Sequence, residues 1–194
     1  PLDSKNPFVM RANVDRLARV IGDHGVDIVH ARSRAPAWSA EAAARLEGAH
    51  FVTTVHGTYS THSVLKRLYN KVMTRGERVI AISNFIASQI QETYHVAPEK
   101  IRVIHRGVDL AEFDPLRVTD ERMIHFAGRW QLPDDVKIIL LPGRLSRWKG
   151  QRVLIEALKR LGRRDVSCLL LGANRGQGGY QRIIEAQIKR ARLE

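Results

Sequence analysis

The sequence predicts an α/β fold in which parallel sheets are covered by helices. Short apolar segments, typical of buried strands, alternate along the 194 residues with segments of helical periodicity. Strands that alternate with helices at this spacing form βαβ units, which build doubly wound parallel sheets. Apolar residues make up 44% of the chain, which is enough to form a core and argues against general disorder.

The first part of the chain contains four predicted strands with helices around them. The strands are expected at 26–30, 51–55, 78–82 and 101–104. The helices are expected at about 14–21, 38–46, 64–73 and 84–94. Ser83 is a good N-cap for the last of these helices, and Pro36 is expected in the loop that follows the first strand.

The alternation breaks at about 110–135 and then resumes. Asp114 and Pro115 predict a turn, and Thr119 can cap a helix that reaches about Trp130. The second alternation consists of strands at 137–141 and 166–171, a helix at 151–161, and a glycine-rich loop at 172–179 that leads to a helix. We therefore expect one domain at 1–110, a linker at 111–136 and a second domain at 137–194.

Both domains are expected to be incomplete. Two parallel strands do not form a stable sheet by themselves, and the chain stops inside a predicted helix without having begun at a methionine. We expect a piece of a longer protein, truncated at both ends. An exposed sheet edge invites pairing with another chain, so a homo-oligomer is also expected.

Charge and composition narrow the class of partner and the compartment. Residues 116–194 hold 17 Lys and Arg against 8 Asp and Glu, which suggests an anionic partner. The single cysteine, Cys168, fits a reducing compartment, and there is neither a signal peptide nor an apolar stretch of about 20 residues, so a cytoplasmic location is expected. The eight histidines show no metal-ligand spacing, so no metal is predicted.

The segment 140–151 carries the strongest functional signal. An apolar strand runs into Gly143 and Arg144, and five residues later Lys149 precedes a glycine and an amphipathic helix. A helix N-terminus favours an anion, and an arginine fork with a lysine point charge holds phosphate oxygens. We interpret the segment as a diphosphate site, and the alternative is an ordinary strand-turn-helix with solvated basic residues.

Other candidate residues follow the predicted strands of the first domain. Functional loops of parallel sheets lie at the carboxyl ends of the strands, where His30, His56, Ser83 and His105 fall. Ser83 is explained by its capping role, and a structural role explains His105 and is also the alternative for His30.

Three motifs in a fixed order carry a family resemblance. They are Val55-His56-Gly57, the segment 103–110 with Phe113 and Pro115, and Gly143-Arg144-Leu145 with Lys149-Gly150. Their order and separation resemble the retaining glycosyltransferase family four, which has the GT-B fold.

The resemblance implies two Rossmann-like domains that face each other across a cleft. Arg144 and Lys149 resemble the pair that binds the donor diphosphate, with Gly143 allowing the backbone to approach it and Gly172 lining the nucleotide pocket. His56 matches a catalytic histidine that closes a strand of the acceptor-side domain, and the alternative is a strand-end histidine that is hydrogen-bonded to the backbone. On the same side, His30 and Arg32 lie at the end of the first strand and are candidates to meet the acceptor.

The implied reaction moves a sugar from a UDP-, GDP- or ADP-sugar to a hydroxyl of a glycan or glycolipid, with retention and without a bound metal. Bacterial lipopolysaccharide or surface glycan synthesis is the implied setting, at the inner face of the cytoplasmic membrane. The basic helix with Lys66, Arg67 and Lys71 is a candidate to touch an anionic membrane surface, although a solvated helix face also explains it.

Three departures from the family pattern stand out. Arg106 replaces a frequent asparagine and is expected to shape the turn into the linker. The family's glycine-rich loop after the first strand and its paired-glutamate motif are not in the chain, which we interpret as truncation.

Two other functions remain open at this point. A GT-B-type epimerase or phosphorylase would share the fold. A basic nucleic-acid-binding α/β module would explain the net charge of +12, but the basic residues are dispersed and aromatic residues make up only 6% of the chain, so no nucleic-acid partner is predicted.

Overall fold

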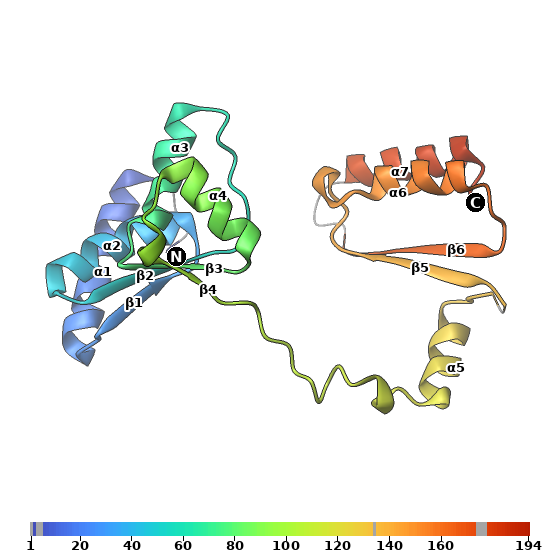
Figure 1. The fold of residues 1–194 in the computed structure, drawn as a ribbon, viewed down its shortest axis with the longest axis horizontal. Coiled ribbons are helices and arrows are strands. Elements are labelled where there is room, and N and C mark those ends of the chain that lie inside the picture. The colour runs from blue at the N-terminus through green and yellow to red at the C-terminus, as the bar shows by residue number, and fades with distance from the viewer. Residues whose placement is uncertain (1, 3–5, 134, 174–177) are drawn as a thin grey trace. The chain divides into compact units, whose positions relative to one another are not determined.

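The computed structural model describes residues 2, 6–133, 135–173 and 178–194. It groups the chain into two compact units, Pro1–Asp109 and Leu110–Glu194, each with its own parallel sheet (Figure 1). The α/β class predicted from the alternation of apolar segments is confirmed.

The first unit is built on a four-stranded parallel sheet with the strand order β1-β2-β3-β4. Its strands are β1 (Ile28–Ala31), β2 (His50–Val55), β3 (Arg78–Ala81) and β4 (Ile101–Val103). Its α-helices are α1 (Pro7–His24), α2 (Arg34–Glu47), α3 (Val64–Asn70) and α4 (Asn84–Tyr94). Because each strand lies beside the next one in the chain, right-handed crossovers place the connecting helices over the same face of the sheet.

The alanine-rich helix α2 is the centre of this unit's packing. Ala37, Ala43 and Ala44 are fully buried, and α2 contacts both α1 and the strands β1 and β2. Side chains no larger than a methyl group let all three neighbours approach closely. The polar Ser39 is also buried there, and its hydroxyl donates to the backbone oxygen of Met10 at 2.8 Å, which satisfies it.

Helix α2 begins earlier than the sequence predicted. Pro36 was expected in a loop, but it is the third residue of a helix that starts at Arg34. A proline in the first helical turn costs little because its missing N–H has no partner there in any case. Strand β1 ends at Ala31, one residue beyond the predicted end, so His30 lies inside the strand.

A buried hydrogen bond ties the sheet to the segment that leads into β3. The Thr53 hydroxyl, on β2, donates to the backbone oxygen of Met73 at 2.7 Å, and both residues are fully buried. Met73 lies in the 3₁₀ helix Lys71–Thr74 that follows α3.

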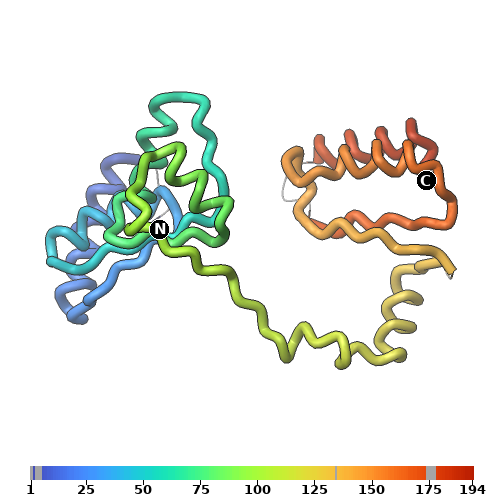
Figure 2. Tube along the Cα trace, in the orientation of Figure 1, coloured from blue at the N-terminus to red at the C-terminus, as the bar shows by residue number. Residues whose placement is uncertain are grey.

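The second unit has a two-stranded parallel sheet, formed by β5 (Lys137–Pro142) and β6 (Val166–Leu171). Helices α6 (Gln151–Leu161) and α7 (Gly178–Ala191) lie side by side over one face of it (Figure 2). Ile155, Tyr180 and Ile184 form the small core, against which Leu170 packs. On the opposite face Ile138 and Leu140 are about half exposed.

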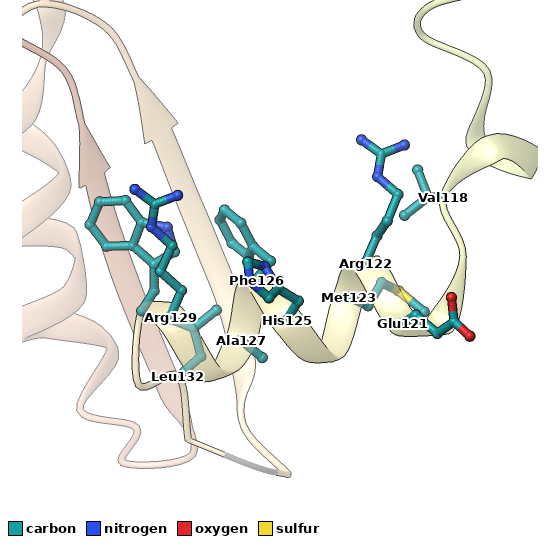
Figure 3. Close-up of a pocket in the computed structure, with 10 residues that line it drawn as sticks. Val118, Glu121, Arg122, Met123, His125, Phe126, Ala127, Arg129 and Leu132 are labelled. Carbon is teal, nitrogen blue, oxygen red and sulfur yellow. The ribbon is translucent and has the colours of Figure 1, made fainter.

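Helix α5 (Asp120–Arg129) lies in the predicted linker, capped by the Thr119 hydroxyl as expected. Met123, Phe126 and Trp130 repeat at helical spacing and line a shallow hollow along the helix (Figure 3). Helix α5 precedes β5 in the chain, and none of the predicted site residues lines its hollow. No helix in the described part of the chain has both the length and the apolar character needed to cross a membrane.

We predict that Thr53→Val lowers the free energy of unfolding by about 1–3 kcal/mol, because the Met73 carbonyl would stay buried without its partner. Urea unfolding followed by circular dichroism measures the change. Thr58→Val, at an exposed position of the loop after β2, is the matched control and should have little effect. Equal stability of both variants would show that this hydrogen bond is dispensable.

Candidate active site

The turn between β5 and α6 brings the predicted diphosphate residues together. Gly143 follows β5 with a φ of 154°, a conformation that side chains rarely adopt. The stem of Lys149 folds back over it, so that a Cβ on Gly143 would lie 3.6 Å from Lys149 Cδ. Arg144 and Lys149 are both exposed, and Lys149 Nζ lies 4.2 Å from the centroid of the Trp148 ring.

Helix α6 begins directly after this turn. Gly150 is its N-cap, in the left-handed conformation with a φ of 83°, and no side chain caps the helix. The first backbone N–H groups of α6 therefore add the positive end of a helix dipole to the two cations.

Gly172, at the end of β6, supports the turn from the neighbouring strand. Gly143 N donates to the backbone oxygen of Leu171 at 2.7 Å. A Cβ on Gly172 would lie 2.0 Å from the backbone oxygen of Gly143, which is closer than atoms can approach. Gly172 is thus required for the backbone of the turn to sit where it does. Of the glycine-rich loop, residues 174–177 lie outside the described residues.

A buried glutamine holds the turn in place through a hydrogen bond, and no pattern in the sequence predicted this role. Gln151 is only 1% exposed, its Nε2 donates to the backbone oxygen of Arg144 at 3.0 Å, and its Oε1 accepts from the Tyr180 hydroxyl at 3.4 Å. In sequence it is simply the first residue of an amphipathic helix. A polar residue so deeply buried must be satisfied by partners, and here one partner is the turn itself.

In the first unit, His56 follows β2 and lies among cationic groups. Arg32 Nε donates to His56 Nε2 at 3.3 Å, and Arg106 Nη2 lies 3.0 Å from His56 Nδ1. Loss of hydration lowers the pKa of His56, and Arg106, Arg32 and His30 lower it further in that order. The imidazole is therefore neutral at physiological pH and available to accept a proton or a hydrogen bond.

His30 is directed to a different partner. Its Nε2 lies 2.7 Å from the hydroxyl of Thr54, and loss of hydration, followed by the charge of Arg32, lowers its pKa as well. Arg34 is held by stacking on Tyr59 at 4.7 Å and by donating to Asn70 Oδ1 at 2.9 Å. It therefore anchors the loop after His56 to α2.

The structure thus gathers the predicted residues into two clusters, one in each unit. Gly143, Arg144, Lys149 and Gly172 meet in the second unit, and His56 and Arg32 meet in the first. Arg106 was expected only to shape a turn, yet it contacts His56. That contact spans 50 positions, and no local pattern indicates it. Ser83 caps α4 through a hydroxyl that accepts from Ile86 N at 3.3 Å, as predicted.

Among the described residues no group of three His, Cys, Asp or Glu side chains is placed to hold a metal ion. The prediction that the reaction needs no metal stays a prediction.

Comparison with known proteins identifies the family. Residues 1–112, more than half of the chain, match the family model described as Glycosyltransferase Family 4. The chain belongs to glycosyltransferase family 4. The family predicted from the three ordered motifs is thereby confirmed.

Solved and curated relatives agree with this assignment. The chain is 40% identical to a glycosyltransferase from Rickettsia africae, with a TM-score of 0.83, and the match covers 98% of this chain and 50% of that one. It is 25% identical over 134 residues to spore coat protein SA of Bacillus subtilis, covering 68% of this chain and 35% of that protein. Anabaena HepE in complex with UDP-glucose has a TM-score of 0.79 at 22% identity, covering 93% of this chain and 49% of that one, and shows the same fold.

The GT-B-like class predicted for the fold is confirmed by these structural neighbours. The chain spans half or less of the length of each of these relatives.

We predict that Gly172→Ala destabilises the second unit by about 1–3 kcal/mol, because the added methyl group collides with the backbone of Gly143. The control is Gly178→Ala in the first turn of α7, where a Cβ meets nothing within 4 Å. Urea unfolding followed by tryptophan fluorescence, to which Trp130 and Trp148 of the second unit contribute, would measure both variants. If the two substitutions were tolerated equally, the close approach of the strand ends would be refuted.

We also predict that Arg106→Gln raises the pKa of His56, because it removes a positive charge that disfavours the imidazolium. In the folded wild-type chain the His56 pKa is lowered, so protonation below about pH 6.5 opposes folding, and stability falls as the pH drops through that range. The variant should show a smaller fall. An NMR titration of the His56 ring measures the pKa, and an unchanged value would contradict the contact.

Proposed function

We propose that the protein moves a sugar from a nucleotide-sugar to a hydroxyl group of a glycan or glycolipid acceptor, with retention of configuration. The observation that carries the proposal is the turn after β5. There Arg144, Lys149 and the uncapped N-terminus of α6 gather positive charge around a glycine backbone. Membership of glycosyltransferase family 4 supports the reaction class.

The donor in this proposal is a UDP-, GDP- or ADP-sugar. Arg144 and Lys149 would bind its diphosphate, Gly143 would leave room for the phosphates, and Gly172 would line the nucleotide pocket. UDP is the first base to test, because HepE, which shares the fold, was crystallised with UDP-glucose.

The chemistry follows from the charges. The bond between the anomeric carbon and the phosphate oxygen breaks, and the acceptor oxygen forms the new bond on the same face of the sugar. The proton of the acceptor hydroxyl passes to the departing diphosphate, whose growing negative charge Arg144 and Lys149 stabilise. The neutral ring of His56 would position the transferred sugar or the acceptor by hydrogen bonding. No metal is required for this charge balance.

We propose that residues 1–110 form the acceptor-side domain, with His56 as its catalytic residue and His30 and Arg32 beside the acceptor. Residues 137–194 form the donor side, and 111–136 join the two. The open edges of the two parallel sheets also favour a homo-oligomer.

The proposed location is the inner face of the cytoplasmic membrane, and the proposed setting is bacterial lipopolysaccharide or surface glycan synthesis. Helix α3 supports a peripheral contact with an anionic membrane. Val64 and Leu65 are 76% and 78% exposed, and Lys66 and Lys71 are exposed on the same short segment.

We predict that Arg144→Ala/Lys149→Ala weakens nucleoside diphosphate binding about 100-fold or more, since each lost charge-assisted hydrogen bond is worth about 1.5–3 kcal/mol. Calorimetric titration of UDP, GDP and ADP into the wild-type and variant chains measures this. Lys159→Ala/Arg160→Ala removes the same charge from the other end of α6 and should leave binding unchanged.

If the Arg144→Ala/Lys149→Ala variant bound the nucleotide as tightly as the wild-type chain, the proposed diphosphate site would be refuted. If the nucleotide binds as expected, the products separate the remaining chemistries. A transferase yields a glycosylated acceptor with the anomeric configuration of the donor, whereas an epimerase yields an altered sugar and a phosphorylase a sugar phosphate.

A further inference from the structure

The contacts of His56 contain a mismatch that a bound ligand would resolve. A neutral imidazole has one N–H and one bare nitrogen, whereas a guanidinium offers only donors. Arg32 donates to Nε2, so Nδ1 carries the proton and faces a second donor, Arg106 Nη2, at 3.0 Å. In the other tautomer Nε2 carries the proton, and the donor that faces it is then Arg32 Nε. Two guanidinium groups therefore flank one ring that can accept from only one of them.

The contacts that Arg32 and Arg106 make with His56 join positive groups to a neutral ring and not to a carboxylate. Elsewhere in the described residues, Arg75, Arg160 and Arg163 form ion pairs with Glu41, Glu156 and Asp165. Arg32 and Arg106 are exposed and instead converge on the imidazole. An external anion could accept from both without displacing a protein carboxylate.

The start of α2 adds to the same positive region. Its N-cap, Ser33, follows Arg32 directly and makes no side-chain capping hydrogen bond. Pro36, at the third helical position, has no N–H to be capped. The 14-residue helix therefore presents the positive end of its dipole, with the N–H groups of Arg34 and Ala35, beside Arg32.

We propose that Arg32 and Arg106, with the N-terminus of α2, form a subsite for a phosphate monoester carried by the acceptor. A phosphate has oxygens enough to accept from both guanidiniums at once and a double negative charge to balance them. His56 then keeps one bare ring nitrogen for the acceptor itself. This inference rests on the proposed function, which makes this edge of the sheet the acceptor side.

The test follows the ring of His56 by NMR in the 194-residue chain labelled with ¹⁵N-histidine, with His56→Gln to assign its signals. Glucose 6-phosphate, inorganic phosphate, glucose and UDP are titrated separately at pH 8 and constant ionic strength. We expect saturable shifts of the His56 nitrogens with the two phosphates and none with glucose. Arg32→Gln and Arg106→Gln should each weaken phosphate binding about tenfold or more.

Arg45→Gln is the matched control, because it removes the same charge from the last turn of α2 and should leave binding unchanged. Arg106→Lys keeps the charge without the fork and should restore part of the affinity. Circular dichroism checks that each variant is folded.

Several outcomes would overturn the subsite. They are the absence of a saturable shift with either phosphate, an equal loss in Arg45→Gln, or a response to UDP alone, which would assign the arginines to the donor. The proposed function fails separately: phosphate binding at His56 with no nucleotide binding at Arg144 and Lys149 would refute the transferase reaction and leave an anion site. Nucleotide binding without phosphate binding would leave the proposed function standing and refute the phosphate subsite.

Discussion

Parallel strand pairing decides where the chemistry of this chain can lie. In a parallel sheet every strand ends at the same edge, so the residues that follow successive strands become neighbours although dozens of positions separate them. Arg32, His56 and Arg106 follow β1, β2 and β4 and meet around one imidazole ring. In the second unit the same rule brings Gly172, after β6, against Gly143, after β5.

The two clusters reach positive charge by different means. In the second unit the backbone fixes the geometry of the turn, because Gly143 and Gly172 pack closely against each other. The cationic side chains of this turn remain exposed. In the first unit the side chains themselves are in contact, and the cost appears as a lowered pKa of His56 and a donor that faces a donor. The first arrangement would suit a ligand that brings several negative charges, and the second would suit a smaller anion beside a neutral ring.

The parts of this picture that could be predicted from sequence are those with local signatures. The helix at 151–161 and the strand at 166–171 have the predicted bounds, because apolar periodicity and flanking glycines mark them. The proximity of Gly143, Arg144 and Lys149 could be predicted because they are closely spaced within one turn. The start of α2 was missed because proline in a first helical turn resembles proline in a loop. Arg106 and Gln151 were missed for another reason: their roles depend on partners far away in the chain, which a single sequence does not identify.

Gln151 has a mechanical consequence. It joins the Arg144 carbonyl at one end to the Tyr180 hydroxyl at the other, so the turn and helix α7 are linked through a single rigid, buried amide. A ligand that stiffens the turn would also stiffen the first turns of α7, although that helix offers it no predicted contact. Slower amide hydrogen exchange around Tyr180 would then show that a ligand is bound at the turn, although the exchanging amides lie in a different helix.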